Sequence, residues 1–150
     1  MADGILNTCL EMYSMTPTGL APEIIKVDSH GELEVSPRDR HNLLRPETVE
    51  SLYFMWMVTQ QQRYRRAAWQ IFKAFRTYSR GADGAYTNLD NVFMVKGSAR
   101  FRDEMPSYWL AETLKYLWLI FQPATTLPMD KWVFSTEAHP FRRFCDACGK

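Results

Sequence analysis

The sequence predicts a mainly α-helical protein in which helices pair as hairpins and short β-hairpins lie in the loops between them. Apolar residues recur with helical spacing in three stretches, residues 4–15, 46–79 and 107–121. Only Gln60 and Gln61 separate the two halves of the middle stretch, and such a short joint is typical of antiparallel neighbouring helices. With 150 residues, 46% hydrophobic and 23% charged, the chain can build one modest core rather than two full domains.

Charge and hydropathy exclude several classes of partner. Eighteen Lys and Arg against 17 Asp and Glu leave a net charge of +1, which gives no field to attract a polyanion. The apolar run over residues 116–121 is far shorter than the roughly 20 residues of a membrane helix. Residues 1–4 have neither the basic nor the apolar region of a secretory signal. We therefore expect no nucleic-acid partner, no membrane segment and no targeting signal within this chain.

The amino-terminal elements are a helix and a loop. Residues 4–15 form the helix, which Thr16-Pro17 ends because the residue before a proline is disfavoured in a helix. Residues 18–23 are a loop, and residues 24–35 predict two short extended pieces around Ser29-His30-Gly31.

The central elements are two antiparallel helices. Pro46 suits the first position of a helix, where its missing N–H costs nothing, and the helix runs to about Thr59. The second helix spans residues 62–79 and is amphipathic. We expect inward positions at Tyr64, Ala67, Ala68, Ile71, Phe72 and Phe75, and outward positions at Arg63, Arg65, Arg66, Lys73 and Arg76.

The last third begins with a long excursion. Residues 80–106 show little periodicity and predict one short strand, residues 91–95; loops of this length are often functional. Ser107 suits an N-cap for a helix to Phe121, and residues 131–137 predict a strand.

The cysteines number three, Cys9, Cys145 and Cys148, so at least one thiol has no partner within the chain. The C-x-x-C of the last two has no second pair and no strand-helix context, which favours a tail without metal or redox chemistry. Their role stays open.

Several acidic residues stand where an ordinary surface charge explains them poorly. Glu47 and Glu50 open a helix directly after Arg45-Pro46, and the free N–H groups there favour an ionised carboxylate. From the residues alone an ordinary acidic first turn is the favoured interpretation of Glu47, and a functional carboxylate is the alternative.

Two further sites suggest binding chemistry. Glu112 lies in the most apolar helix one turn after Tyr108, which suits a sugar held by a carboxylate and an aromatic ring, although a core glutamate paired with an arginine is an equal alternative. Thr136-Glu137 brings a hydroxyl, a carbonyl and a carboxylate together, and oxygen donors alone suit a hard cation such as calcium.

Four segments carry a resemblance to a known family. Residues 18–24 (TGLAPEI), 41–52 (HNLLRPETVESL), 110–116 (LAETLKY) and 133–140 (VFSTEAHP) resemble, in this order, the class I α-mannosidases of glycoside hydrolase family 47. The resemblance covers about residues 8–140 and leaves residues 141–150 as an unassigned tail.

The resemblance implies a calcium-dependent glycosidase of the secretory pathway, in the ER or Golgi or at a membrane. Such enzymes remove α-1,2-linked mannose from high-mannose N-glycans on glycoproteins with inversion of configuration. Their fold is an (αα)7 barrel, in which residues 46–79 would be one helical hairpin.

The resemblance also assigns roles to individual residues. Glu47 matches the proposed general base, and Thr136 matches the residue that binds calcium through its carbonyl and hydroxyl. Tyr108 stands where the family usually has a phenylalanine stacked on the sugar. The residues matched to substrate binding are Arg45, Tyr108, Glu23, Glu112 and Glu137.

The chain departs from the family on the acid side of the reaction. An inverting hydrolase needs a second carboxyl group about 6.5 to 9.5 Å from the base, and in the family the acid and its helpers lie upstream of the segments matched here. Cys9 likewise resembles the second cysteine of a disulfide whose first member lies upstream.

We therefore expect residues 1–150 to be the carboxy-terminal part of a family 47 catalytic domain, inactive by itself and dependent on the amino-terminal part of the barrel as its partner. The inward faces of Trp56, Phe72 and Trp118 would then be exposed. The alternative is a non-catalytic remnant that binds mannose or calcium, or an inert truncated product.

Overall fold

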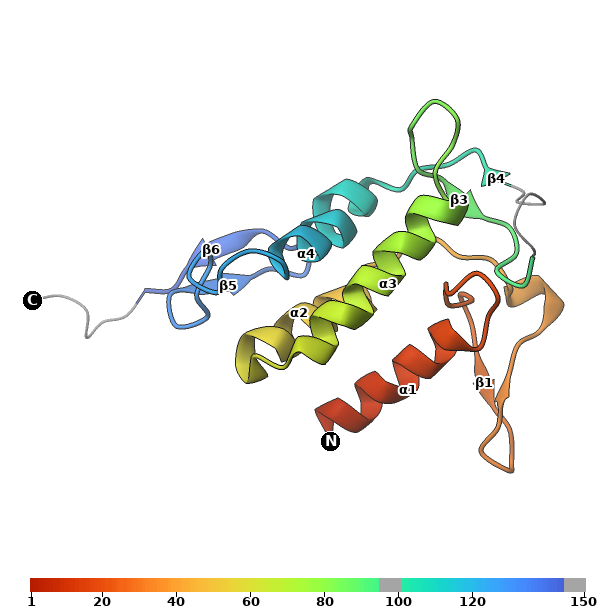
Figure 1. Cartoon of the computed structure of the whole chain (residues 1–150), viewed down its shortest axis with the longest axis horizontal. Coiled ribbons are helices and arrows are strands. Elements are labelled where there is room, and N and C mark those ends of the chain that lie inside the picture. Colours follow the sequence, from red (N-terminus) through yellow and green to blue (C-terminus); the bar gives the residue numbers. More distant parts are fainter. Residues whose placement is uncertain (95–100, 145–150) are drawn as a thin grey trace, which may run out of the picture.

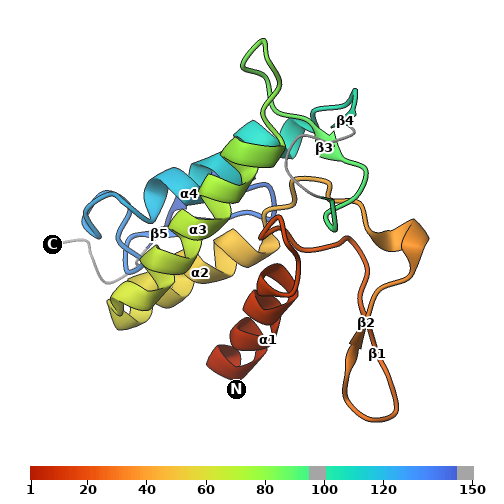
Figure 2. The same ribbon diagram turned by 45° about the vertical axis from the view of Figure 1, so that its right-hand side comes forward.

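Helices form most of the regular structure in the computed structural model, which describes residues 1–94 and 101–144. The helices are α1 (Ala2–Ser14), α2 (Glu47–Thr59), α3 (Gln62–Tyr78) and α4 (Leu114–Leu119), with a π-helical segment, η2 (Trp109–Thr113), leading directly into α4. Helix α2 packs against α1, α3 and α4 and is the central element (Figure 1, Figure 2). The mainly α-helical prediction is confirmed, and each predicted helix agrees with the structure to within two residues at either end. None of the helices among the described residues combines the length and apolar character needed to cross a membrane.

The strands form three two-stranded antiparallel ladders. Their members are β1 (Lys26–Val27) with β2 (Leu33–Glu34), β3 (Asn88–Leu89) with β4 (Phe101–Arg102), and β5 (Trp132–Phe134) with β6 (Pro140–Arg142). A 3-10 turn, η1 (Pro37–Asp39), follows β2. The predicted hairpin within residues 24–35 is confirmed, and it projects away from the helices in both views (Figure 1, Figure 2).

Two strand predictions are wrong in position. Residues 91–94 form no strand, because Asn91 folds the chain into a turn in which its Oδ1 accepts the Phe93 N–H at 2.9 Å. The strand of this region lies earlier in the sequence, at β3, which pairs with β4. The strand predicted for residues 131–137 ends at Phe134, and Thr136 and Glu137 lie in a turn rather than on a strand. Cys145 and Cys148 lie outside the described residues.

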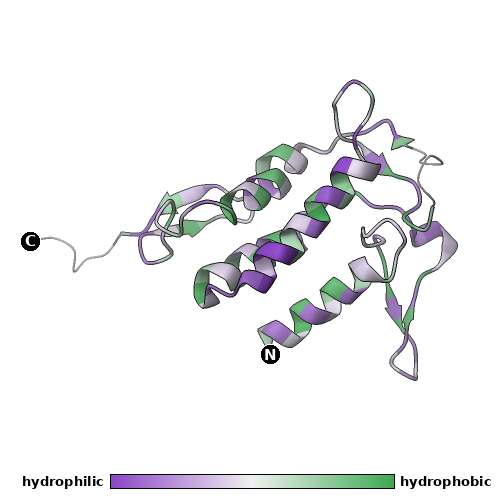
Figure 3. Ribbon diagram, viewed as in Figure 1, coloured by the Kyte–Doolittle hydropathy of each residue, from purple (hydrophilic) through white to green (hydrophobic). Residues whose placement is uncertain are grey.

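The hairpin of α2 and α3 follows the predicted pattern. Gln60 closes α2 in the left-handed conformation, φ 56°, and its N–H donates to the Trp56 carbonyl at 2.8 Å. Along α3, hydrophilic and hydrophobic residues alternate (Figure 3), and the predicted inward residues are buried or half-buried. Arg65 is the exception among the outward residues, because it is half-buried, stacks 3.8 Å from the Trp56 ring and donates to the Ile120 carbonyl at 2.7 Å. We expected the inward faces of Trp56, Phe72 and Trp118 to be exposed. The contact with Arg65 explains why Trp56 is only 5% exposed. Trp118 is 58% exposed, as expected, and Phe72 is half-buried.

An aromatic cluster joins the last hairpin to the helices. The ring of Phe134 on β5 lies 5.9 Å from Tyr53, 6.0 Å from Phe54 and 5.7 Å from Tyr116, measured between centroids. Residues of α2, α4 and β5 therefore share one core, and this packing fixes the direction of the turn that follows β5.

Candidate active site

The site residues predicted from the sequence lie at the starts of helices and in the loops beside them. Glu23, Arg45 and Glu47 line one small cavity of about 140 Å³, together with Tyr13 and Asn42. Three residues from separate parts of the sequence are therefore brought together.

Arg45 connects two of the predicted substrate-binding residues. Its Nε donates to the Glu23 carboxylate, and its guanidinium lies 5.8 Å from the centroid of the Tyr108 ring. The bond to Glu23 raises the pKa of Arg45 above its ordinary value. A positive charge, a carboxylate and an aromatic ring are thus grouped at this place.

The loop before Arg45 is held by Asn42, which sequence reasoning did not single out, and by Tyr108, which it did. Asn42 Oδ1 accepts the Leu44 N–H at 3.0 Å, and Asn42 Nδ2 donates to the Ala21 carbonyl at 2.8 Å. The Tyr108 hydroxyl donates to the Leu43 carbonyl at 2.7 Å, which gives a use to the hydroxyl that a phenylalanine would lack.

Glu47 is the first residue of α2, directly after the buried Pro46. Its side chain is exposed at the amino end of the helix. The neighbouring Tyr13 was missed by sequence reasoning: burial raises the pKa of Tyr13 to about 12, and the nearby Glu47 carboxylate adds to that rise. Tyr13 therefore stays a neutral phenol beside Glu47.

Burial and three neighbouring carboxylates act on Glu112. Burial raises the pKa of Glu112, the charges of Glu137, Glu47 and Glu50 raise it further, and the charge of Lys115 lowers it. Within residues 1–94 and 101–144 no arginine forms an ion pair with Glu112. Glu50, which sequence reasoning placed only in the helix start, belongs to this group and accepts a hydrogen bond from the Tyr116 hydroxyl at 3.2 Å.

The turn between β5 and β6 carries Thr136 and Glu137, both exposed. Ser135 Oγ accepts the Glu137 N–H at 3.2 Å, and Lys115 Nζ donates to the Ala138 carbonyl at 2.9 Å, so helix α4 holds the end of the turn. Thr136 makes no side-chain hydrogen bond with the residues the structure describes. Its hydroxyl and carbonyl therefore remain available as ligands.

The oxygen atoms of Thr136 and its neighbours could hold a calcium ion only together with further ligands. In the described part of the chain no three acidic, histidine or cysteine side chains converge closely enough to hold a metal ion. Thr136 offers two oxygens and Glu112 and Glu137 lie near each other. A calcium ion here would thus need further oxygens from water or substrate, since it takes six to eight.

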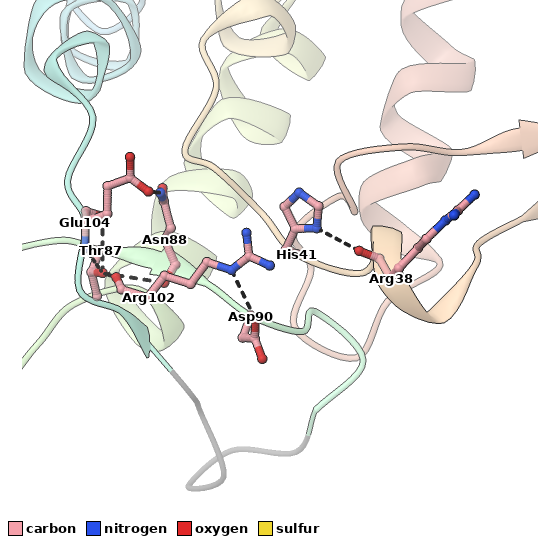
Figure 4. Close-up of polar contacts among 7 residues, drawn as sticks. All are labelled: Arg38, His41, Thr87, Asn88, Asp90, Arg102 and Glu104. Atoms are coloured by element: carbon pink, nitrogen blue, oxygen red, sulfur yellow. Dashed lines mark hydrogen bonds and ion pairs between the residues drawn. The ribbon is translucent and has the colours of Figure 1, made fainter.

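Polar contacts outside the predicted site fasten the neighbouring loops. Arg102 Nε donates to Asp90 at 3.0 Å, and Asn88 Nδ2 donates to Glu104 at 3.2 Å, so the two sides of the β3–β4 excursion are linked (Figure 4). His41 Nδ1 lies 3.2 Å from the Arg38 carbonyl. The Asn42 N–H donates to the Leu89 carbonyl at 2.9 Å, so β3 contacts the loop that leads to Arg45. The sequence pattern did not predict these contacts.

Known proteins match the chain over most of its length. The profile of glycosyl hydrolase family 47 matches residues 1–143. The endoplasmic reticulum mannosyl-oligosaccharide 1,2-alpha-mannosidase of Schizosaccharomyces pombe is 48% identical over 147 residues, which cover 94% of this chain and 28% of the relative. The human protein of the same description is 41% identical over 146 residues, covering 93% of this chain and 21% of the relative.

A solved structure shows the same fold. The alpha-1,2-mannosidase from Trichoderma reesei superposes with a TM-score of 0.82 at 31% identity, over 92% of this chain and 32% of that chain. The chain thus spans about a quarter of the length of these two sequence relatives.

Proposed function

Because this chain belongs to glycosyl hydrolase family 47 and has the fold of part of an (αα)7 barrel, we propose that it forms the base and calcium side of an α-1,2-mannosidase active site. The substrate class is a high-mannose N-linked glycan, and the setting is the secretory pathway. The observation that carries the proposal is the grouping of Glu47 with Glu23 and Arg45 around one cavity, beside the carboxylate of Glu112.

In this proposal Glu47 takes the proton of the attacking water. Glu47 lies exposed at the amino end of α2, where water can reach it, and the buried Pro46 fixes it next to Arg45. Arg45, held by Glu23, grips the terminal mannose, and the Tyr108 ring covers a C–H face of the sugar. Glu112 and Glu137 accept hydrogen bonds from sugar hydroxyls or waters.

Thr136 would hold a calcium ion through its hydroxyl and carbonyl. When bound, calcium supplies a fixed charge that orients mannose hydroxyls and the attacking water. The general acid that an inverting reaction requires on the other face of the sugar is proposed to come from a segment outside these 150 residues, since no residue here matches the family's acid motif.

A second candidate function is mannose or calcium binding without turnover. It is favoured by the fact that the residues assigned to sugar and cation, Arg45, Tyr108 and Thr136, all lie in this chain, whereas the acid has no counterpart in it. For the isolated 150 residues we expect binding without mannose release.

The test is a chimera in which residues 1–143 replace the matching segment of the Schizosaccharomyces pombe relative. We expect calcium-dependent release of mannose from a high-mannose glycan, and Glu47→Gln should lower kcat about 10³-fold while glycan binding persists, since general-base catalysis contributes about 10² to 10⁴. Glu11→Gln, at an exposed position on α1, is the matched control.

Three results would contradict the proposal. A well-folded chimera without activity would remove the assigned role of the segment, and unchanged kcat in Glu47→Gln would remove Glu47 from the base role. Mannose release by the 150-residue chain alone would show that no external acid is needed.

A further inference from the structure

Two successive carbonyl groups in the loop before Arg45 are held by side chains of a single helix. The Leu43 carbonyl accepts a hydrogen bond from the Tyr108 hydroxyl at 2.7 Å, and the Leu44 carbonyl accepts one from Thr113 Oγ1 at 2.6 Å. Leu44 is followed directly by Arg45-Pro46-Glu47. The orientation of these carbonyls therefore determines how the chain enters the site.

The loop needs such contacts because its backbone is unfavourable by itself. Leu44 has φ 61°, in the left-handed region that residues with a Cβ rarely adopt. Leu44 and Thr113 are both 0% exposed, so water cannot replace the Thr113 hydroxyl as donor to the Leu44 carbonyl. Loss of this one hydroxyl would leave a buried carbonyl without a partner and a backbone conformation without its restraint.

The π-helical segment explains how one helix reaches both carbonyls. In an α-helix, Thr113 would lie about 140° around the axis from Tyr108, since each residue turns about 100°. In η2 the Leu114 N–H donates to the Trp109 carbonyl, the five-residue spacing of a π-helix. This wider turn places residues four and five positions apart on the same side, so Glu112 and Thr113 both lie on the side of Tyr108.

We infer that Thr113 is a positioning residue of the proposed active site. It acts through the Leu44 carbonyl and fixes the direction in which Arg45 and Glu47 enter the cavity, while Glu112, its neighbour in η2, faces the substrate. The inference rests on the proposed function for its catalytic consequence, but not for its structural one.

The first test uses the 150-residue chain. Thr113→Val keeps the shape of the side chain and removes its hydroxyl, whereas Thr113→Ser keeps a hydroxyl. Thr59→Val is the matched control, because Thr59 Oγ1 also donates to a backbone carbonyl, that of Met55, at 2.6 Å. The readout is amide hydrogen exchange of Leu44, whose N–H is bonded to Asn42 Oδ1. We expect at least 10-fold faster exchange in Thr113→Val, restoration in Thr113→Ser and no change in Thr59→Val. Equal exchange in Thr113→Val and Thr59→Val overturns the inference.

The second test measures catalysis in the chimera described above. Thr113→Val should lower kcat about 10-fold or more, since misplacement of a reacting group by about 1 Å costs up to 10²-fold, whereas Thr113→Ser should recover most of the loss and Thr59→Val should leave kcat unchanged. Unaltered kcat in Thr113→Val overturns the positioning role.

Two control outcomes separate this inference from the proposed function. An inactive parent chimera contradicts the proposed function, and Leu44 exchange in the 150-residue chain then decides whether Thr113 fixes the loop. If Thr113→Val does not fold, Thr113→Ala removes the same hydroxyl with a smaller side chain, and exchange at Leu44 no faster in that variant than in Thr59→Val overturns the inference.

Discussion

Glu112 is the residue at which burial and like charge act together most clearly. Its ordinary pKa is 4.5, and burial and then the charges of Glu137, Glu47 and Glu50 raise it. A carboxyl group with a raised pKa holds its proton more tightly in the folded chain than in the unfolded one. Ionisation of Glu112 therefore destabilises the fold.

A pH-dependent stability difference follows for Glu112→Gln. Below pH 4.5 the carboxyl group is protonated in both states, so the variant and the wild type should have equal free energies of unfolding; as the pH rises through the folded pKa, the wild type loses stability and the variant does not. At pH 7 the variant should be the more stable protein in urea unfolding. Glu34→Gln, at an exposed position on β2, should match the wild type at both pH values. A variant less stable than wild type at pH 7 would show that Glu112 has a stabilising partner.

At the residue scale, the positions of Arg45 and Glu47 were predictable from the sequence, whereas the backbone conformation of Leu44 was not. Glu47 and Arg45 could be placed because a helix start is visible as Arg-Pro-Glu ahead of apolar periodicity. The left-handed conformation of Leu44 could not be predicted, since leucine rarely adopts positive φ. Its conformation arises from Asn42 and Thr113, and Thr113 lies 69 residues away along the chain.

At the scale of elements, the helices were predictable and the short ladders were predictable only in part, since β1–β2 was found and β3–β4 was not. Helices α2 and α3 extend over 13 and 17 residues, which is enough for the apolar period to define both. A two-residue strand such as β3 has no alternation to detect, so its partner determines it. The π-helical η2 escaped prediction for a related reason, because its apolar pattern is also compatible with an α-helix.

The β5–β6 hairpin is the element that carries the proposed calcium ligand. Phe134 anchors it against Tyr53, Phe54 and Tyr116, and its turn holds Thr136. The aromatic anchor thus connects core packing to the position of an exposed ligand.

Removal of that anchor should loosen the hairpin. We expect Phe134→Ala to lower the free energy of unfolding by about 2 kcal/mol, less than the 3 to 5 typical of a fully buried phenylalanine because this ring is half-buried. Phe141→Ala, on the same hairpin but 58% exposed, should cost about 0.5 kcal/mol or less. Urea unfolding of both variants is the measurement, and equal losses would argue that the cluster does not hold the hairpin.

At the scale of the whole molecule, one face remains without a covering layer. Residues of α3 and the helix ending in α4 line an apolar groove of about 400 Å³, which contains Trp69, Phe72, Trp118 and Phe121. Trp69 and Trp118 are 45% and 58% exposed. In a closed barrel of helical hairpins each hairpin has a neighbour on either side, and in this chain the groove has none among the described residues.

We expect this face to make the isolated chain self-associate. Exposed aromatic side chains in one contiguous patch favour burial against another apolar surface, and Trp118 lines this groove and is 58% exposed. Trp118→Glu should therefore shift the chain toward monomer in concentration-dependent sedimentation, because association would now bury a charge. Phe141→Glu is a close control, since Phe141 is also 58% exposed but lies on β6, outside the groove. If both substitutions reduce association equally, general charge repulsion rather than the α3–α4 groove governs it; if only Trp118→Glu does, the groove is the surface that a neighbouring helical hairpin would cover.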